Sequence, residues 1–213
     1  MSQSMFDKLS HVLVPIAGKL NNNRYLQVLR DAFMLAFPFT IFGSIAVVIM
    51  NLPFLDKVMS EGAIKALQAA LGVAPQATMN IMTLFVVFGI GYYLSRSYEV
   101  ESIFGGAIAL VSFLMVTPFS TSVEGKGIVE NVLALDRLGA KGMFLGMIVA
   151  FLSAEIYRFI VQKNFTIKMP AGVPPAVAKS FSALIPAVST LTVFLAINII
   201  VTQVFHTNLH DAI

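Results

Sequence analysis

The chain has 213 residues, of which 57% are apolar and only 12% are charged, and its mean hydropathy is +0.84. A soluble domain is about one quarter charged because its surface must face water, so this composition excludes an ordinary soluble domain and indicates a membrane protein. The net charge of +3 is small and spread out, which gives no argument for nucleic-acid binding, and the lack of cysteine excludes disulfides and thiolate chemistry.

Residues 1–30 precede the first long apolar stretch and carry an amphipathic pattern. Apolar residues recur there at three- and four-residue spacing, at Met5, Phe6, Leu9, Val12, Leu13, Ile16 and Leu20. The spacing predicts either a cytoplasmic helix that lies in the membrane interface or one that packs on cytoplasmic loops of the same protein. The asparagines at 21–23 are expected to end this helix, because asparagine favours turns.

Five apolar stretches then predict transmembrane helices, since a span needs about 20 mostly apolar residues to cross about 30 Å of hydrocarbon. They lie at 32–50, 77–94, 103–119, 138–160 and 181–205. Backbone groups in lipid must be satisfied internally, and these runs do not alternate as barrel strands do. We therefore predict an all-α polytopic membrane protein in which residues 31–213 form one transmembrane domain.

Basic residues are distributed unequally between the two sides that this arrangement defines. Nine of the 14 lie on the side that holds the N-terminus: Lys8, Lys19, Arg24, Arg30, Arg96, Arg158, Lys163, Lys168 and Lys179. The other side holds five: Lys57, Lys65, Lys126, Arg137 and Lys141. The excess marks the cytoplasmic side, so the N-terminus is predicted inside and residue 213 outside.

Small residues form a regular stripe in the fourth predicted span, at Gly142, Gly146, Ala150 and Ala154. This spacing of four lets two helix backbones approach closely. The stripe predicts either helix packing within one subunit or a subunit interface. Gly89 and Gly91 in the second predicted span, without the rest of a dinucleotide fingerprint, also indicate close helix packing.

Few side chains in the sequence could support catalysis. Glu155 and Arg158 form the one close charge pair inside a predicted span, and at i, i+3 they share a helix face. They lie in its last turns, where side chains reach the interface, so a structural pair is the simpler interpretation. His11, His206 and His210 make no metal cluster, and no nucleophile elbow or phosphate loop is present. The sequence predicts no catalytic residue, cofactor or metal site, which disfavours an intramembrane enzyme.

The loop at 168–180 contains three prolines and one glycine, which predict an irregular, docked segment on the cytoplasmic side instead of a helix. From this loop into the next span the sequence MPAGVPPAVAKSFSALIP, residues 169–186, closely resembles the membrane (IIC) components of the lactose, cellobiose and diacetylchitobiose permeases of the bacterial phosphotransferase system. The segment NNNRYLQVLRDAFMLAFPFTIFGSIAVVI, residues 21–49, resembles the entry to the first span of the same family.

The resemblance implies a permease component in the bacterial plasma membrane that takes up and phosphorylates a β-linked disaccharide such as cellobiose or diacetylchitobiose. It also implies a IIB partner that supplies the phosphate, and a homodimer. Members of this family are about twice as long, with the sugar site in the second half, so no substrate or catalytic residue is carried over. The resemblance therefore covers the N-terminal half. A dimerisation or scaffold module, or a truncated remnant without transport activity, is the alternative.

Overall fold

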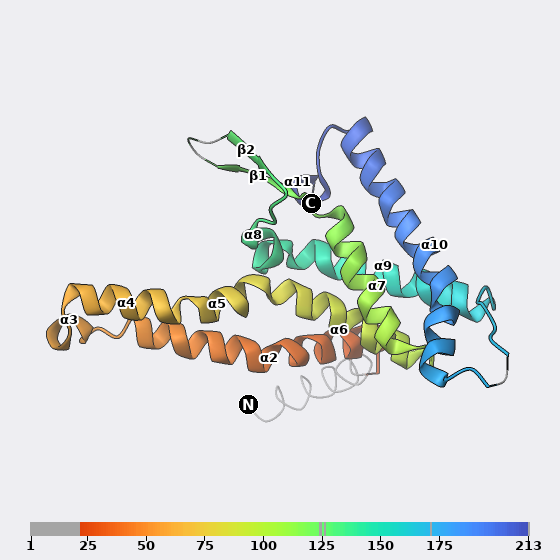
Figure 1. The fold of residues 1–213 in the computed structure, drawn as a ribbon, viewed down its shortest axis with the longest axis horizontal. Coiled ribbons are helices and arrows are strands. Elements are labelled where there is room, and N and C mark those ends of the chain that lie inside the picture. The colour runs from red at the N-terminus through yellow and green to blue at the C-terminus, as the bar shows by residue number, and fades with distance from the viewer. Residues whose placement is uncertain (1–21, 124, 126, 171, 213) are drawn as a thin grey trace, which may run out of the picture.

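The computed structural model describes residues 22–123, 125, 127–170 and 172–212 (Figure 1). The predicted amphipathic helix at the N-terminus falls largely on residues 1–21, which lie outside the described residues. The long apolar helices are α2 (Arg24–Met50), α6 (Met82–Ser97), α7 (Ser102–Val116), α9 (Met143–Gln162) and α10 (Pro175–Val204). The shorter elements are α3 (Leu55–Val58), α4 (Glu61–Leu71), α5 (Val73–Ala77), η1 (Met79–Ile81), β1 (Ser120–Val123), β2 (Gly127–Glu130), α8 (Leu135–Leu138), η2 (Ala140–Gly142) and α11 (Leu209–Ala212).

The polytopic helical fold predicted from the sequence is confirmed. Within the described residues, four helical stretches are long and apolar enough to cross a membrane: Arg24–Met50, Glu61–Ser97, Ala140–Gln162 and Pro175–Val204. The third predicted span, at 103–119, corresponds to α7, which is apolar but shorter, because Thr117 caps its C-terminal end and Pro118 follows. At 15 residues, α7 is about 22 Å long, which is less than the hydrocarbon thickness.

The first span begins eight residues earlier than predicted, at Arg24. The Asn23 side chain accepts hydrogen bonds from the backbone N–H groups of Tyr25 (3.0 Å) and Leu26 (3.4 Å), so it caps the N-terminus of α2. The expectation that the asparagines end a preceding helix falls on residues outside those the structure describes. Asn23 begins the next helix, and α2 passes directly into the apolar stretch.

The predicted irregular loop at 168–180 is wrong over its last six residues, because α10 begins at Pro175. Pro175 occupies the first helical turn, where its missing N–H would have no intrahelical partner in any case. The left-handed backbone of Gly172 (φ +104°) belongs to the turn before it. Proline therefore starts this helix instead of preventing it, and the fifth span is correspondingly longer than predicted.

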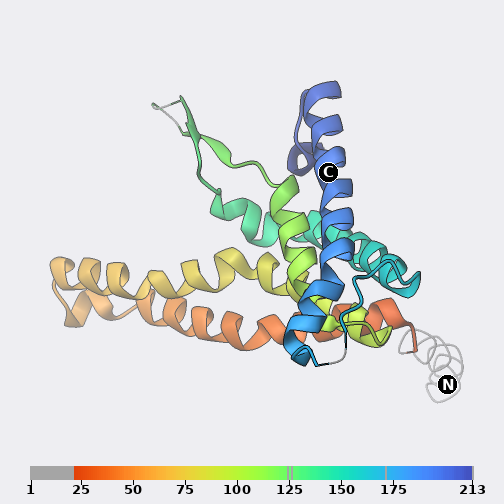
Figure 2. The ribbon, with the colours of Figure 1, turned by 45° about the vertical axis from the view of Figure 1, so that its right-hand side comes forward.

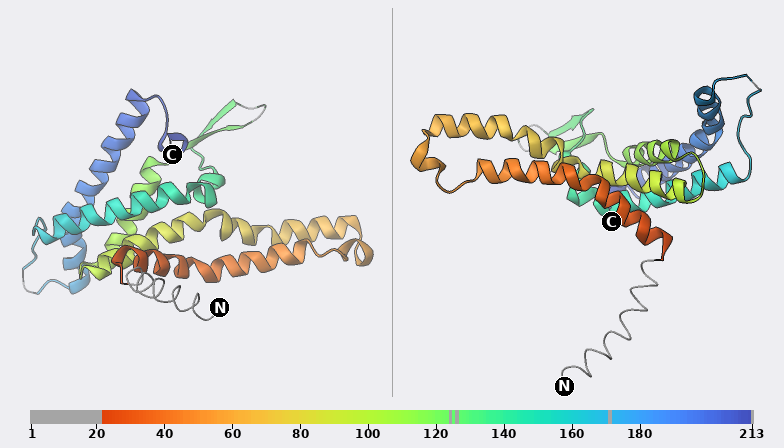
Figure 3. Two further views of the ribbon diagram at one scale, coloured as in Figure 1. Left: turned by 180° about the vertical axis from the view of Figure 1, so that it is seen from behind. Right: turned by 90° about the horizontal axis from the view of Figure 1, so that it is seen from below.

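The elements from α4 to α6 form one long, bent helical arm that lies antiparallel to α2 (Figures 1 and 3). The bend falls at Thr78, whose backbone leaves the helical region (φ −127°, ψ −73°) and whose hydroxyl donates to the Ala74 carbonyl at 2.7 Å. The second predicted span thus starts inside a longer helical arm. The sequence did not predict α4, the part of this arm farthest from α6.

The core surrounds α6, which packs against α2, α7 and α9. Its largest fully buried apolar side chains include Ile90 and Leu94, together with Phe113 of α7. Figure 2 shows α10 at a steep angle to the antiparallel helices α2 and α6, with α7 beside α10. The buried residues of α10 are Ala183, Pro186, Thr190 and Phe194, so most of this helix faces away from the described core.

Glycines on α6 permit close helix approach, as the sequence indicated. A Cβ built on Gly89 would lie 2.9 Å from the Cα of Ala32 in α2, closer than real contacts allow. A Cβ on Gly91 would meet the backbone oxygen of Gly105 in α7 and lie 2.6 Å from the Ala109 Cβ. Because the obstructing atoms at Gly105 and Ala32 are backbone, these two crossings cannot accept a side chain on α6.

One feature departs from the all-helical prediction. Strands β1 and β2 pair in an antiparallel hairpin, in which Ser120 pairs with Glu130 and Val123 with Gly127. Gly125 and Gly127 have positive φ values of 78° and 75°, which favour glycine. The hairpin projects above α8, away from α2 and the arm from α4 to α6 (Figure 1).

Candidate functional site

Polar side chains from several helices converge where the first turn of α2, the end of α6 and the end of α9 meet. The hydroxyls of Tyr25 (α2) and Tyr98 (just after α6) donate to the same Glu155 carboxylate oxygen on α9, at 3.0 and 2.9 Å. Arg158 donates to the other oxygen from Nε at 2.9 Å, with Nη2 at 2.8 Å. We call these four residues the Glu155 cluster.

Cations stack on the ring of Tyr98 in this cluster. The guanidinium carbons of Arg24 and Arg158 lie 4.1 and 4.4 Å from the ring centroid, within the range of cation–π attraction. The Glu155 and Arg158 side chains are about a quarter exposed, so water still reaches them. The cluster therefore fastens α2, α6 and α9 together, and its carboxylate is fully engaged as an acceptor.

A second set of contacts ties α7 and α10 to the same end. Lys179 of α10 forms an ion pair with Glu101 at 2.9 Å, and Glu101 immediately precedes α7. The buried Tyr157 hydroxyl of α9 donates to the Glu101 carbonyl at 3.2 Å. All five long helices thus have one terminus at this end, which we call the basic end.

The sequence predicted the Glu155–Arg158 pair, and the structure contains it. It did not predict the two tyrosines. The sequence did hold a signal for them. The charge distribution placed Arg24, Arg96 and Arg158 on the same side of the membrane. Tyr25 is next to Arg24, and Tyr98 lies two residues after Arg96.

The small-residue stripe divides between two elements. Gly142 lies in η2, just before α9, while Gly146, Ala150 and Ala154 are buried on α9. A Cβ on Gly146 would lie 2.6 Å from Thr83 Cγ2 and 2.8 Å from Val87 Cγ2, both on α6. Gly146 thus faces a neighbouring helix of the same chain.

The opposite end is organised around His210 of α11. Its Nε2 lies 3.0 Å from the Thr117 hydroxyl at the end of α7, and its ring packs on Phe113 with centroids 5.7 Å apart. Burial, and secondarily the nearby Arg137 guanidinium, lower the pKa of His210 from its usual value. His206 is exposed in the turn before α11, so the two histidines do not share a helix. Among the described residues, no group of three or more metal-ligating side chains occurs.

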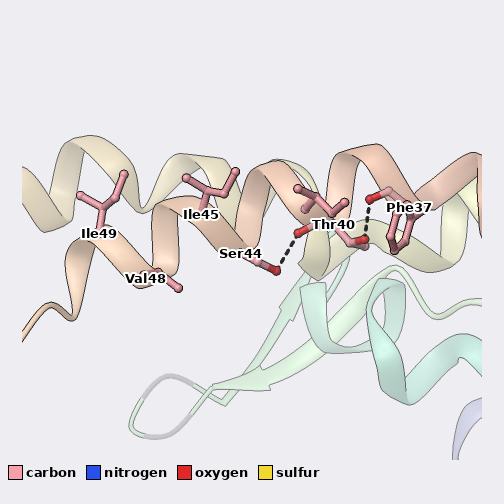
Figure 4. Close-up of a pocket in the computed structure, with 7 residues that line it drawn as sticks. Phe37, Thr40, Ser44, Ile45, Val48 and Ile49 are labelled. Atoms are coloured by element: carbon pink, nitrogen blue, oxygen red, sulfur yellow. Dashed lines mark hydrogen bonds between the residues drawn. The ribbon is translucent and has the colours of Figure 1, made fainter.

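The outer half of α2 presents an apolar strip (Figure 4). It is lined by Phe37, Thr40, Ile41, Ser44, Ile45, Val48 and Ile49. All seven come from one helix, so the strip is an exposed helix face without opposing walls. The Thr40 and Ser44 hydroxyls donate to carbonyls of their own helix, at 2.8 and 2.7 Å, which leaves the face apolar in character.

Comparison with known proteins gives consistent matches along the chain. Residues 30–213 match the family described as "Phosphotransferase system, EIIC". The chain is 70% identical over 209 residues to the oligo-beta-mannoside-specific EIIC component of Bacillus subtilis, covering 98% of this chain and 47% of that protein. It is 37% identical over 212 residues to the cellobiose-specific EIIC component of Geobacillus stearothermophilus, covering 94% and 46%.

A solved structure is also similar. The transporter ChbC, the IIC component from the N,N'-diacetylchitobiose-specific phosphotransferase system, matches with a TM-score of 0.85 and 40% identity, covering 96% of this chain and 49% of that one. The chain therefore spans about half the length of the relatives that it matches.

Proposed function

This chain belongs to the phosphotransferase-system EIIC family, and we propose that it forms the N-terminal half of a permease component that takes up and phosphorylates a β-linked oligosaccharide. The observation that carries the proposal is the 70% identity to an oligo-beta-mannoside-specific component over nearly the whole chain. Relatives that are specific for cellobiose and diacetylchitobiose support the same class of β-linked sugar.

In this proposal the chain supplies a rigid helical frame in the bacterial plasma membrane. The Glu155 cluster and the close crossings of α6 fix the helices relative to one another. Such a fixed set of helices could support the sugar-binding half of the permease while that half moves. A IIB partner delivers the phosphate, and the sugar site lies in the second half of the full-length permease. The exposed apolar faces of α2 and α10 contact lipid, that second half, or the second copy in a homodimer.

A chimera tests this function directly. Residues 1–213 replace the matching half of the Bacillus subtilis oligo-beta-mannoside component, and accumulation of phosphorylated sugar is measured in cells that contain the IIB partner. We expect uptake comparable to that of the parent permease, because the two halves would meet through similar surfaces. Residues 1–213 expressed without a second half are expected to accumulate none.

Two outcomes would contradict the proposal. One is a chimera that inserts at parental levels yet accumulates no phosphorylated sugar. The other is phosphorylated sugar in cells that express residues 1–213 alone, which would place the sugar site in this half. Replacing Gly62 by Leu in the chimera provides a control for tolerated change, because a Cβ on Gly62 meets nothing within 4 Å.

We also propose that the basic end faces the cytoplasm. This end holds Arg24, Arg96, Arg158 and Lys179, in agreement with the positive-inside rule. A reporter fused at Gly172, in the turn before α10, is therefore expected to be cytoplasmic, and one fused after residue 213 to be extracytoplasmic. Paired alkaline phosphatase and fluorescent-protein fusions measure this, and the reverse pattern would refute the orientation.

A further inference from the structure

A pocket of about 330 Å³ lies between the first turns of α2 and the last turns of α6, beside the Glu155 cluster. Its lining includes Arg24, Val28, Asp31, Tyr93, Arg96 and Ser97. We propose that this pocket binds the phosphate of an anionic phospholipid headgroup. The inference concerns lipid recognition and does not depend on sugar transport.

The pocket carries an excess of positive charge. Arg24 and Arg96 each contribute a guanidinium, a group that binds phosphate oxygens in bidentate fashion. The single carboxylate among the lining residues, Asp31, is already paired with Arg30, whose Nε and Nη2 both lie 2.9 Å from its Oδ1. The site therefore attracts an anion.

The two arginines of the pocket differ in how they are held. Arg24 is stacked on Tyr98 and so is positioned in advance. Arg96 is exposed and forms no ion pair with any carboxylate in the described part of the chain. A bound phosphate would supply the counter-charge that Arg96 lacks.

The surroundings favour a lipid over a soluble phosphate. The pocket lies where two spanning helices, α2 and the arm that ends in α6, have their termini at the basic end. An aromatic line runs from it along α6 towards the apolar part of the helix: the Tyr93 and Tyr92 rings are 5.2 Å apart, and those of Tyr92 and Phe88 are 6.2 Å apart. Tyrosines at this level are typical of the membrane interface, and basic pockets between helices bind anionic headgroups.

The test uses purified residues 1–213 in neutral detergent, with binding of phosphatidylglycerol and phosphatidylcholine measured by native mass spectrometry. We expect preferential retention of phosphatidylglycerol. Arg96→Gln should weaken its binding about fivefold, since one basic residue near a membrane surface contributes about 1 kcal/mol. Asp31→Asn should not weaken binding, because it removes the one carboxylate among the lining residues and leaves both guanidinium groups of the pocket in place.

Lys163→Gln is the matched control. Lys163 is exposed at the same end of the molecule but does not line the pocket, so this variant should retain phosphatidylglycerol like the parent. Equal losses in Arg96→Gln and Lys163→Gln would reduce the effect to general surface charge and overturn the proposal. Displacement of the lipid by millimolar glycerol 3-phosphate would show that a soluble phosphate ester is the ligand, which would overturn the lipid assignment.

Discussion

Replacing Gly146 by Leu is expected to leave little monodisperse protein after solubilisation. A Cβ at this position would already approach Thr83 Cγ2 and Val87 Cγ2 more closely than side chains tolerate, and leucine adds three more carbons. Overpacking of a tight core costs about 1–3 kcal/mol for much smaller insertions. Separation of α9 from α6 is the expected consequence, and fluorescence-detected size-exclusion chromatography of a tagged chain measures it.

Gly62→Leu is the matched control for Gly146→Leu. It makes the same chemical change in α4, where a Cβ meets nothing within 4 Å, so the elution profile should stay parental. Two results would contradict the expectation. A folded Gly146→Leu monomer with reduced crosslinked dimer would assign the stripe to a subunit interface, and a fully parental profile would show that α9 does not need the close approach.

Replacing Glu155 by Ala is expected to lower thermal stability by several degrees. The change removes the shared acceptor of Tyr25 and Tyr98 and leaves the Arg158 guanidinium without its carboxylate. Loss of such partners costs about 1–3 kcal/mol, and partial exposure keeps the effect in the lower part of that range because water replaces some of the bonds. For a chain of this size each kcal/mol corresponds to about 2–4 °C in Tm.

The matched control for Glu155→Ala is Asp136→Ala, which also removes a carboxylate from an ion pair. Asp136 contacts Lys141 at 3.1 Å, but both side chains are more than half exposed, so its loss should change Tm by less than about 2 °C. Tyr98→Phe combined with Glu155→Ala should be less destabilising than the sum of the two single changes. Additive effects, or equal shifts for Glu155→Ala and Asp136→Ala, would show that the Glu155 cluster does not fasten the helices.

The helix boundaries show which parts of the fold can be predicted from local sequence. Hydropathy located every long apolar helix, because the length of an apolar run is a property of consecutive residues. It placed the starts of α2 and α10 too late, since a helix continues through polar residues until a cap is reached. Asn23 caps the start of α2 and Pro175 occupies the first position of α10, and both residues are visible in the sequence, but a hydropathy average does not take such boundary signals into account.

The candidate sites illustrate the opposite case. Gly146 could be identified as a packing position from its spacing, yet the sequence left open whether α9 packs on its own chain or on another. The structure places Thr83 and Val87 against it, some 60 residues earlier in the chain. The contact is set by how the helices fold back on one another, and a periodic pattern on one helix carries no information about its neighbour.

The sequence by itself determined the membrane environment, the helical class, the approximate spans and the family resemblance, because each depends on composition or on contiguous motifs. Only the tertiary structure decided which side chains meet at the basic end. Tyr25 and Glu155 are 130 residues apart, and the pocket between Arg24 and Arg96 exists only where α2 and α6 are antiparallel. Such sites arise from long-range packing of apolar helices, in which the polar residues at the helix ends are brought together by contacts made elsewhere along the helices.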